Sequence, residues 1–313
     1  MLAYVIRRII QSIIVLIGVT IITFILLHML GNPVHVILGT RQSPAQVAAL
    51  TKQLGLNKPL PVQYLIWLLH LLQGNLGFSW KQNNTVTALL GQRIPNTLVL
   101  VGTSTVLAIV IAVPIGILQA VRRNRPDDYL ATALSFIFYS MPVFWLGLLL
   151  IVLFSITLGW LPSGFQQNQT SLFSQLNGLI LPIMTLTLVT VALFSRYMRS
   201  SMLENLVQDY VRTAKAKGVP SRTILFRHVL RNALIPVITL IGLSIPGILS
   251  GAVITEFVFN YPGMGLLFVN AAVTDDFPVL LGVVVVVGVA TVIGSLIADI
   301  LYAVADPRIR YVS

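Results

Sequence analysis

The chain has 313 residues, of which 56% are hydrophobic and only 9% are charged. A water-soluble fold needs more polar side chains than this to cover its surface, so the composition predicts an all-α polytopic membrane protein. The net charge of +11 comes from basic residues scattered among long apolar runs, a distribution that argues against nucleic acid as a partner. Cysteine is absent, which excludes disulfides, a thiolate nucleophile and cysteine-based metal sites.

Six apolar stretches approach or exceed the roughly 20 residues that a helix needs to cross a bilayer. They are Ile9–Leu30, Leu98–Val121, Tyr129–Leu158, Leu179–Phe194, Ala233–Thr255 and Val279–Val304. The first has no small-residue cleavage signature and exceeds a signal-peptide core in length, so we expect a retained span. A shorter run, Val62–Leu72, gives only about 16 Å of helix and is expected to lie at the membrane surface.

The basic residues predict the orientation of the chain. With the N-terminus inside, most of them fall in cytoplasmic segments, as the positive-inside rule requires, and both termini are then cytoplasmic. The inner residues are Arg7, Arg8, Arg122, Arg123, Arg125, Arg196, Arg199, Arg212, Lys215, Lys217, Arg222, Arg227, Arg231, Arg308 and Arg310. The outer residues are Arg41, Lys52, Lys58, Lys81 and Arg93, all in one long stretch.

Helix-start and helix-end signals divide this outer stretch. Ser43, Pro44 and Gln46 form a capping box with a first-turn proline, and Gly55 is placed to close the helix that follows. A second short helix is expected around Trp67, whose amphipathic ring suits the membrane interface. Two interpretations stay open here, a loop that rests on the membrane and a docking surface for an external partner.

Six basic residues gather between the fourth and fifth predicted spans, in "DYVRTAKAKGVPSRTILFRHVLRNALIPV". Apolar residues with helical spacing predict an amphipathic helix over 207–217, with a stripe formed by Val207, Tyr210, Val211 and Ala214. Gly218 can end this helix in the left-handed conformation, Pro220 cannot continue it, and Ser221 can cap the next helix. Such a rigid knob either contacts a cytoplasmic protein or binds anionic lipid headgroups and fixes topology.

Few polar groups lie within the spans. His28, Glu256 and Asp299 are near span ends, which favours interhelical hydrogen bonds over substrate contact. Kinks are expected at Pro114, Pro142, Pro182, Pro236 and Pro246, and close helix contact at Gly247 and Gly251. The histidines are dispersed and form no H-E-x-x-H motif, which argues against an intramembrane enzyme. The sequence shows no visible internal repeat and no charged selectivity ring, which argues against a secondary transporter or a channel.

Several motifs, in order, resemble one family. "RTAKAKG" and "RHVLRNALIPV" look like the coupling loop of ABC-transporter permeases, in the B-type subunits of the dipeptide/oligopeptide/nickel importer branch. "YVIRRIIQSIIVLIGVTIITFILLHMLGNPV", "SMPVFWLGLLLIVLFSITLGWLPSGF" and "AVITEFVFNYPGMGLLF" are similar to other segments of that family. Positions 212–214 read Arg-Thr-Ala where the broad consensus has Glu-Ala-Ala, and Arg231 replaces a consensus proline that appears here as Pro236.

The resemblance implies a type I ABC importer permease fold with six transmembrane helices. It implies three regions: 1–30 with the cytoplasmic N-terminus and first span, 31–97 as an extracytoplasmic region with short helices, and 98–313 as a five-span core. Within the core, 196–232 would be the cytoplasmic coupling loop. The residues that would couple to the ATPase are Tyr210, Val211, Arg212, Thr213, Ala214, Lys215, Ala216, Lys217 and Gly218.

The resemblance also implies partners and a substrate. The chain would be no enzyme and hold no cofactor, because two separate cytoplasmic ATPase subunits would bind ATP and Mg. The sequence agrees, since it contains no G-x-x-x-x-G-K-[ST] motif. A sister C-type permease, an extracytoplasmic substrate-binding protein and membrane lipids are the other expected partners, in a bacterial or archaeal inner membrane. The expected substrate is a di- or oligopeptide, with nickel chelates or glutathione as alternatives.

Overall fold

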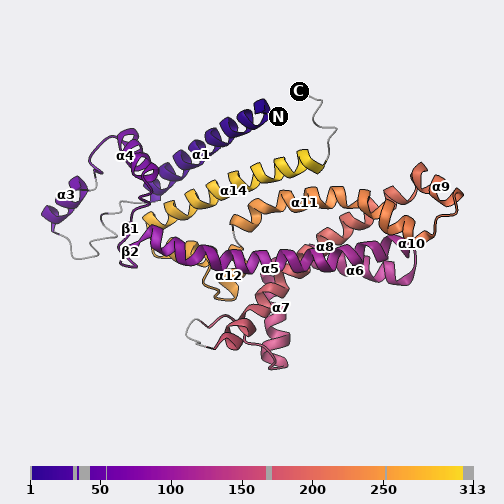
Figure 1. Cartoon of the computed structure of the whole chain (residues 1–313). Helices are drawn as coiled ribbons and strands as arrows, with labels where there is room; N and C mark the ends of the chain where they lie inside the picture. The colour runs from indigo at the N-terminus through magenta and orange to yellow at the C-terminus, as the bar shows by residue number, and fades with distance from the viewer. Residues whose placement is uncertain are drawn as a thin grey trace. The chain divides into compact units, whose positions relative to one another are not determined.

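The computed structural model describes residues 2–30, 34, 43–53, 55–166, 171–250 and 252–305. Helices dominate (Figure 1), as the apolar composition predicts. The chain divides into two compact units, one formed by residues 1–96 and 262–292 and the other by 97–261 and 293–313. The two units are described separately below.

The first unit combines helices from both ends of the chain with a short hairpin. Its elements are α1 (Leu2–Leu30), α3 (Pro44–Gln53), α4 (Leu60–Leu72), β1 (Phe78–Ser79), β2 (Asn84–Thr85), the start of α5 (Val86–Val121), α13 (Met264–Val273) and the first part of α14 (Phe277–Ala305). The two strands pair antiparallel. Val86 and Leu90 of α5 pack with Leu267 of α13 and Leu280 of α14 in the core of this unit.

The two short helices α3 and α4 form as the sequence predicts. Ser43 and Gln46 make a reciprocal capping box, because the Gln46 amide donates to Ser43 Oγ at 3.2 Å and the Ser43 amide to Gln46 Oε1 at 3.3 Å. Gly55 follows α3 with φ +68°. α4 has 13 residues, which is too short to span, and the ring of its Trp67 lies 5.8 Å from the ring of Phe24 in α1.

The second unit contains the long central helices. Its elements are the rest of α5, α6 (Pro126–Ser140), α7 (Val143–Leu150), the π-helical turn η1 (Ile151–Thr157), α8 (Leu172–Leu206), α9 (Asp209–Ala216), α10 (Ser221–Thr223), the π-helical turn η2 (Ile224–Val229), α11 (Leu230–Ser250), α12 (Val253–Val258) and the end of α14. α8 packs against both α6 and α11. Ser201 Oγ of α8 donates to the Ala233 carbonyl of α11 at 2.9 Å.

Four described helices are long and apolar enough to cross a membrane: Val86–Val121, Leu172–Leu206, Ser221–Ser244 and Phe277–Ala298. The pair formed by α6 and the α7–η1 segment makes a fifth if it counts as one span. α1 is a helix of 29 residues that contains the apolar stretch Ile10–Ile25. The chain is therefore a polytopic helical membrane protein, while the predicted number of six spans stays a prediction.

The predicted third span, Tyr129–Leu158, is not one straight helix but breaks at Pro142, where a kink was expected. The chain bends by 108° between α6 and α7, and Figure 1 shows α7 turning away from α6. Pro142 has no amide hydrogen to donate, and it forces Met141 into an extended conformation with φ −73° and ψ 132°. Hydropathy does not reveal this break, because both sides of it are apolar.

Other boundaries also differ from the apolar runs. α5 begins at Val86 rather than Leu98, because Thr85 Oγ1 accepts a hydrogen bond from the Ala88 amide at 3.3 Å and starts the helix early. α8 extends the predicted Leu179–Phe194 at both ends, since polar residues continue the helix beyond its apolar part. α11 ends at Ser250, before the predicted Thr255.

His28 and Glu256, two of the three ionisable residues predicted to bond between helices, do so. His28 Nε2 lies 3.1 Å from Gln63 Oε1 of α4, and Thr97 Oγ1 donates to buried Glu256 Oε1 at 2.7 Å. The Asp299 side chain and Gly251 lie outside the described residues. At Gly247 an added Cβ would meet no atom within 4 Å in the described part of the chain, so the close helix contact predicted there is not seen.

Candidate functional site

α9 packs on the longer helices of its unit, with Val211 as its one fully buried side chain. Val211 is only 1% exposed and lies in a cluster with Met198 and Met202 of α8 and Ile224 of η2. Tyr210 packs at the edge of this cluster, and its hydroxyl donates to Asn205 Oδ1 at 2.9 Å. Because an isolated eight-residue helix is unstable in water, α9 depends on this seat for its conformation.

The predicted apolar stripe is correct except at its first residue. Ala214 packs on the cluster together with Tyr210 and Val211, but Val207 ends α8 and is 62% exposed. Gln208 has an extended backbone, with φ −68° and ψ 153°, and α9 starts after it at Asp209. This residue interrupts the helical spacing that the sequence pattern assumed, so Val207 does not share a face with Val211.

Gly218 ends α9 in the left-handed conformation, as predicted. Its φ is +76°, its amide donates to the Lys215 carbonyl at 2.9 Å, and the Val219 amide donates to the Ala214 carbonyl at 3.1 Å. These two bonds form a Schellman motif, and Val219 and Ala214 both pack on the same cluster. The turn therefore has a defined geometry that a residue with a Cβ would strain.

The next helix begins one residue earlier than the predicted Ser221 cap implies. α10 starts at Ser221, yet the capping position is Pro220, and no side chain caps the helix. The Ile224 amide donates to the Pro220 carbonyl at 3.0 Å instead. η2 and α11 then continue the helix, so the predicted sequence of helix, turn and helix is confirmed and the Ser221 cap is wrong.

The opposite side of α9 is polar and basic. We call it the basic face; its residues are Arg212, Thr213, Lys215, Ala216 and Lys217, all exposed. Within the described residues, ion pairing on this helix is limited to Arg212 Nη1 and Asp209 Oδ1, 3.5 Å apart. An exposed pair of this kind contributes little to stability. Chemically, this surface can dock on a polar or acidic groove while Val211 holds the helix from behind.

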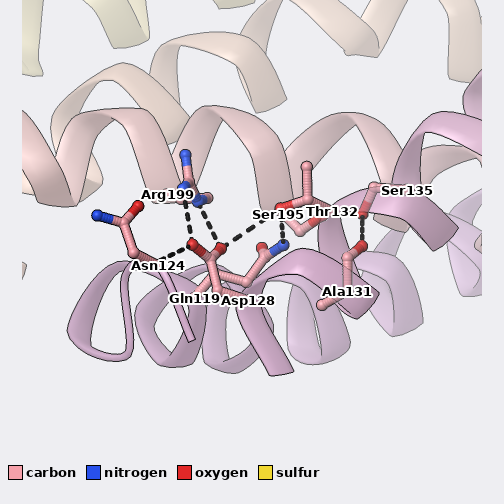
Figure 2. Close-up of polar contacts among 8 residues, drawn as sticks. All are labelled: Gln119, Asn124, Asp128, Ala131, Thr132, Ser135, Ser195 and Arg199. Atoms are coloured by element: carbon pink, nitrogen blue, oxygen red, sulfur yellow. Dashed lines mark hydrogen bonds and ion pairs between the residues drawn. The ribbon is translucent and has the colours of Figure 1, made fainter. Parts of the chain in front are cut away.

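A polar layer lies between α6 and α8 (Figure 2). Arg199 of α8 donates from Nε to Asp128 Oδ1 at 2.8 Å and from Nη2 to Asp128 Oδ2 at 2.9 Å. The Asn124 amide donates to Asp128 Oδ2 at 3.0 Å, and Gln119 Nε2 donates to Thr132 Oγ1 at 3.2 Å. Asp128 is 2% exposed, and the guanidinium and the backbone amide that donate to its carboxylate compensate for the loss of hydration.

Ser135 Oγ and Ser195 Oγ extend the layer, 3.3 Å apart. On the α5 side, α8 approaches closely at Gly116, where an added Cβ would lie 2.5 Å from Met198 Cβ. Sequence reasoning missed these contacts. The positive-inside rule accounts for Arg199, and the helix start at Pro126 accounts for Asp128, so neither residue by itself indicates the pairing.

In the first unit, the hairpin and the first turns of α5 are attached to residues near α13 and α14. Buried Ser79 Oγ donates to Asp276 Oδ2 at 2.5 Å, and the Pro262 carbonyl accepts from Asn96 Nδ2 at 2.9 Å. The hairpin therefore has a fixed position in this unit, with Trp80 exposed beside it. Among the described residues, no group of three or more His, Asp or Glu side chains is arranged to hold a metal ion.

Comparisons with known proteins cover nearly the whole chain. Residues 112–311 match the family described as binding-protein-dependent transport system inner membrane component, and residues 1–101 match the N-terminal region of such components. The oligopeptide transport system permease protein AppB of Bacillus subtilis is 44% identical over 316 residues, with 99% of this chain and 100% of that protein covered.

Two further relatives match over almost their whole length and have similar names. A putative peptide permease protein of Brucella ovis is 45% identical over 317 residues, with 99% of each chain covered. The dipeptide transport system permease protein DppB of Escherichia coli K12 is 36% identical over 337 residues, again with 99% of each chain covered.

Proposed function

Because the chain belongs to the family of binding-protein-dependent transport system inner membrane components, we propose that it is a permease subunit of an ATP-driven peptide importer. Full-length relatives named for oligopeptides and dipeptides support a peptide substrate over nickel chelates or glutathione. The chain forms the translocation path together with a sister permease of the same family.

The proposed coupling element is α9 with the turn that follows it. The observation that carries this proposal is its two-sided construction: Val211 is buried in the hydrophobic cluster while the basic face is exposed. When a partner displaces the exposed face of such a helix, the buried face transmits the displacement to the long helices on which it packs. The partner is a cytoplasmic ATPase subunit, one for each permease, and ATP and Mg are bound there.

The proposed topology has six spans and both termini in the cytoplasm. The spans are α1, α5, the bent α6–α7 pair, α8, the η2–α11 helix and α14. The basic face then lies in the cytoplasm, in agreement with the positive-inside rule. Residues 31–97 and 256–278 form the extracytoplasmic surfaces, and we infer that a substrate-binding protein docks on them. The chain is thus a multi-pass protein of a bacterial or archaeal inner membrane.

A charge reversal distinguishes coupling from lipid attraction. Arg212→Glu on the basic face is compared with Arg123→Glu, an exposed basic residue outside the loop. Lipid attraction of about 1 kcal/mol per basic residue predicts similar small effects for both variants. Coupling predicts that Arg212→Glu alone lowers substrate-stimulated ATPase activity and peptide uptake in the reconstituted complex at unchanged membrane abundance. Equal activity of the two variants would contradict the coupling role.

A further inference from the structure

One turn of α8 receives the contacts of α9. Met198 and Met202 are fully buried in the cluster that seats Val211. On the α5 side, Gly116 lies so close to Met198 that no Cβ fits between them. Close-packed interiors transmit displacement rather than absorb it. A movement of α9 therefore acts directly on α8 at this turn.

Arg199 belongs to the same turn and extends to α6. Its two parallel hydrogen bonds to Asp128, at 2.8 and 2.9 Å, fix both the separation and the relative orientation of the two groups (Figure 2). A lysine would offer a point charge without this fork. The Arg199 side chain is 28% exposed and Asp128 is 2% exposed, so separating the pair would leave a buried carboxylate without its counter-charge. At this level α6 is held to α8.

The adjacent acidic residue, Asp127, also pairs with an arginine, but its carboxylate is not buried. Asp127 Oδ2 lies 2.8 Å from Arg122 Nη1, and the two side chains are 35% and 52% exposed. Water can replace either partner of such a pair at little cost. The contrast between neighbouring residues shows that burial, and not the presence of an ion pair, distinguishes Asp128.

We propose that the Asp128–Arg199 pair is the joint that makes α6 follow α9 during transport, an inference that rests on the proposed coupling role of α9. Met198 and Met202 carry the displacement of α9 to α8, and the ion pair carries it to α6. Beyond α6 the chain continues through the 108° bend into α7. Asp128 and Arg199 are positioning residues, since they act through the helices that they join.

The test uses the full complex with its ATPase subunits and sister permease in lipid nanodiscs. The chain has no cysteine, so Leu130→Cys on α6 and Thr223→Cys on α10, both exposed, are its only labelling sites, and the partner subunits are made cysteine-free before labelling. Their separation is measured by pulsed electron resonance without nucleotide and with ATP plus vanadate. Uptake of peptide per ATP hydrolysed is measured on the unlabelled variants, together with subunit stoichiometry and melting temperature.

Asp128→Asn is compared with Asp127→Asn. In the wild type and in Asp127→Asn we expect one label separation that nucleotide does not change. In Asp128→Asn we expect a broadened or nucleotide-dependent separation. We also expect uptake per ATP to fall at least about five-fold, the lower end of typical coupling between linked sites, with ATPase subunits still bound. If Asp128→Asn does not accumulate, Arg199→Lys decides the question, because it keeps the charge and loses the fork.

The outcomes separate the joint from the coupling role of α9. A single nucleotide-independent separation in Asp128→Asn, with wild-type uptake per ATP, overturns the joint. If Asp128→Asn gives that result while Arg212→Glu loses coupling, the proposed joint fails and the coupling role of α9 stands. If Arg212→Glu also keeps wild-type coupling, the proposed role of α9 fails with it.

Discussion

Val211→Ala measures how firmly α9 is seated. The change removes two buried carbons from a side chain that contacts Met198, Met202 and Ile224 in one cluster. At about 0.8 kcal/mol per carbon, with a small cavity term, the seat of α9 loses about 2 kcal/mol. Because α9 has eight residues and no stability of its own, this loss appears as local opening and not as global unfolding.

Hydrogen exchange of the peptide over 209–219 reports that opening. A loss of about 2 kcal/mol corresponds to about 30-fold faster exchange of the protected α9 amides. Val207→Ala, the same substitution at an exposed position nearby, should leave exchange unchanged. Peptide uptake should fall in Val211→Ala only. Equal exchange in the two variants would refute the inference that Val211 anchors the helix.

Three further substitutions probe other contacts. Gly218→Val should abolish most uptake, because a β-branched residue is strained at φ +76°, while Gly218→Asn, which tolerates this conformation, should retain it in the same assay. Gly116→Ala should destabilise the purified chain by about 1–3 kcal/mol through its clash with Met198, whereas Gly102→Ala in the same helix, with no neighbour within 4 Å, should leave the melting temperature unchanged. Thr97→Val removes a donor to buried Glu256 and should cost about 1–3 kcal/mol in thermal unfolding, with Thr97→Ser close to wild type; equal melting of the two Thr97 variants would contradict this.

Much of the helical architecture follows from local sequence chemistry. Long apolar runs predict the cores of α5, α8, α11 and α14, because backbone groups in a bilayer must bond within their own segment. The capping box at Ser43 also has its predicted geometry, since its bonds reach only three residues along the chain. The kink at Pro142 was expected from its missing amide hydrogen, but the 108° size of the bend was not. The early start of α5 at Val86 was not predicted either, because hydropathy averages over the polar residues that decide it.

In the candidate site, too, local sequence patterns identify some residues, while others depend on tertiary packing. Val211 and Gly218 were identifiable from helical spacing and from glycine's conformational freedom, and both have the expected geometry. The Asp128–Arg199 pair was not, because its partners are 71 residues apart and only the packing of α6 on α8 brings them together. The role of residues 210–218 in coupling to an ATPase stays a prediction.

Site-specific crosslinking from α9 tests the central claim most directly. The chain has no cysteine, so Ala216→Cys on the basic face accepts a single photoreactive label, which is attached before the chain is assembled with its partner subunits. Ile156→Cys, on an exposed apolar part of η1, serves as the control. We expect Ala216→Cys to crosslink to an ATPase subunit and Ile156→Cys to crosslink to lipid. Capture of lipid alone from Ala216→Cys would contradict the coupling role of this loop.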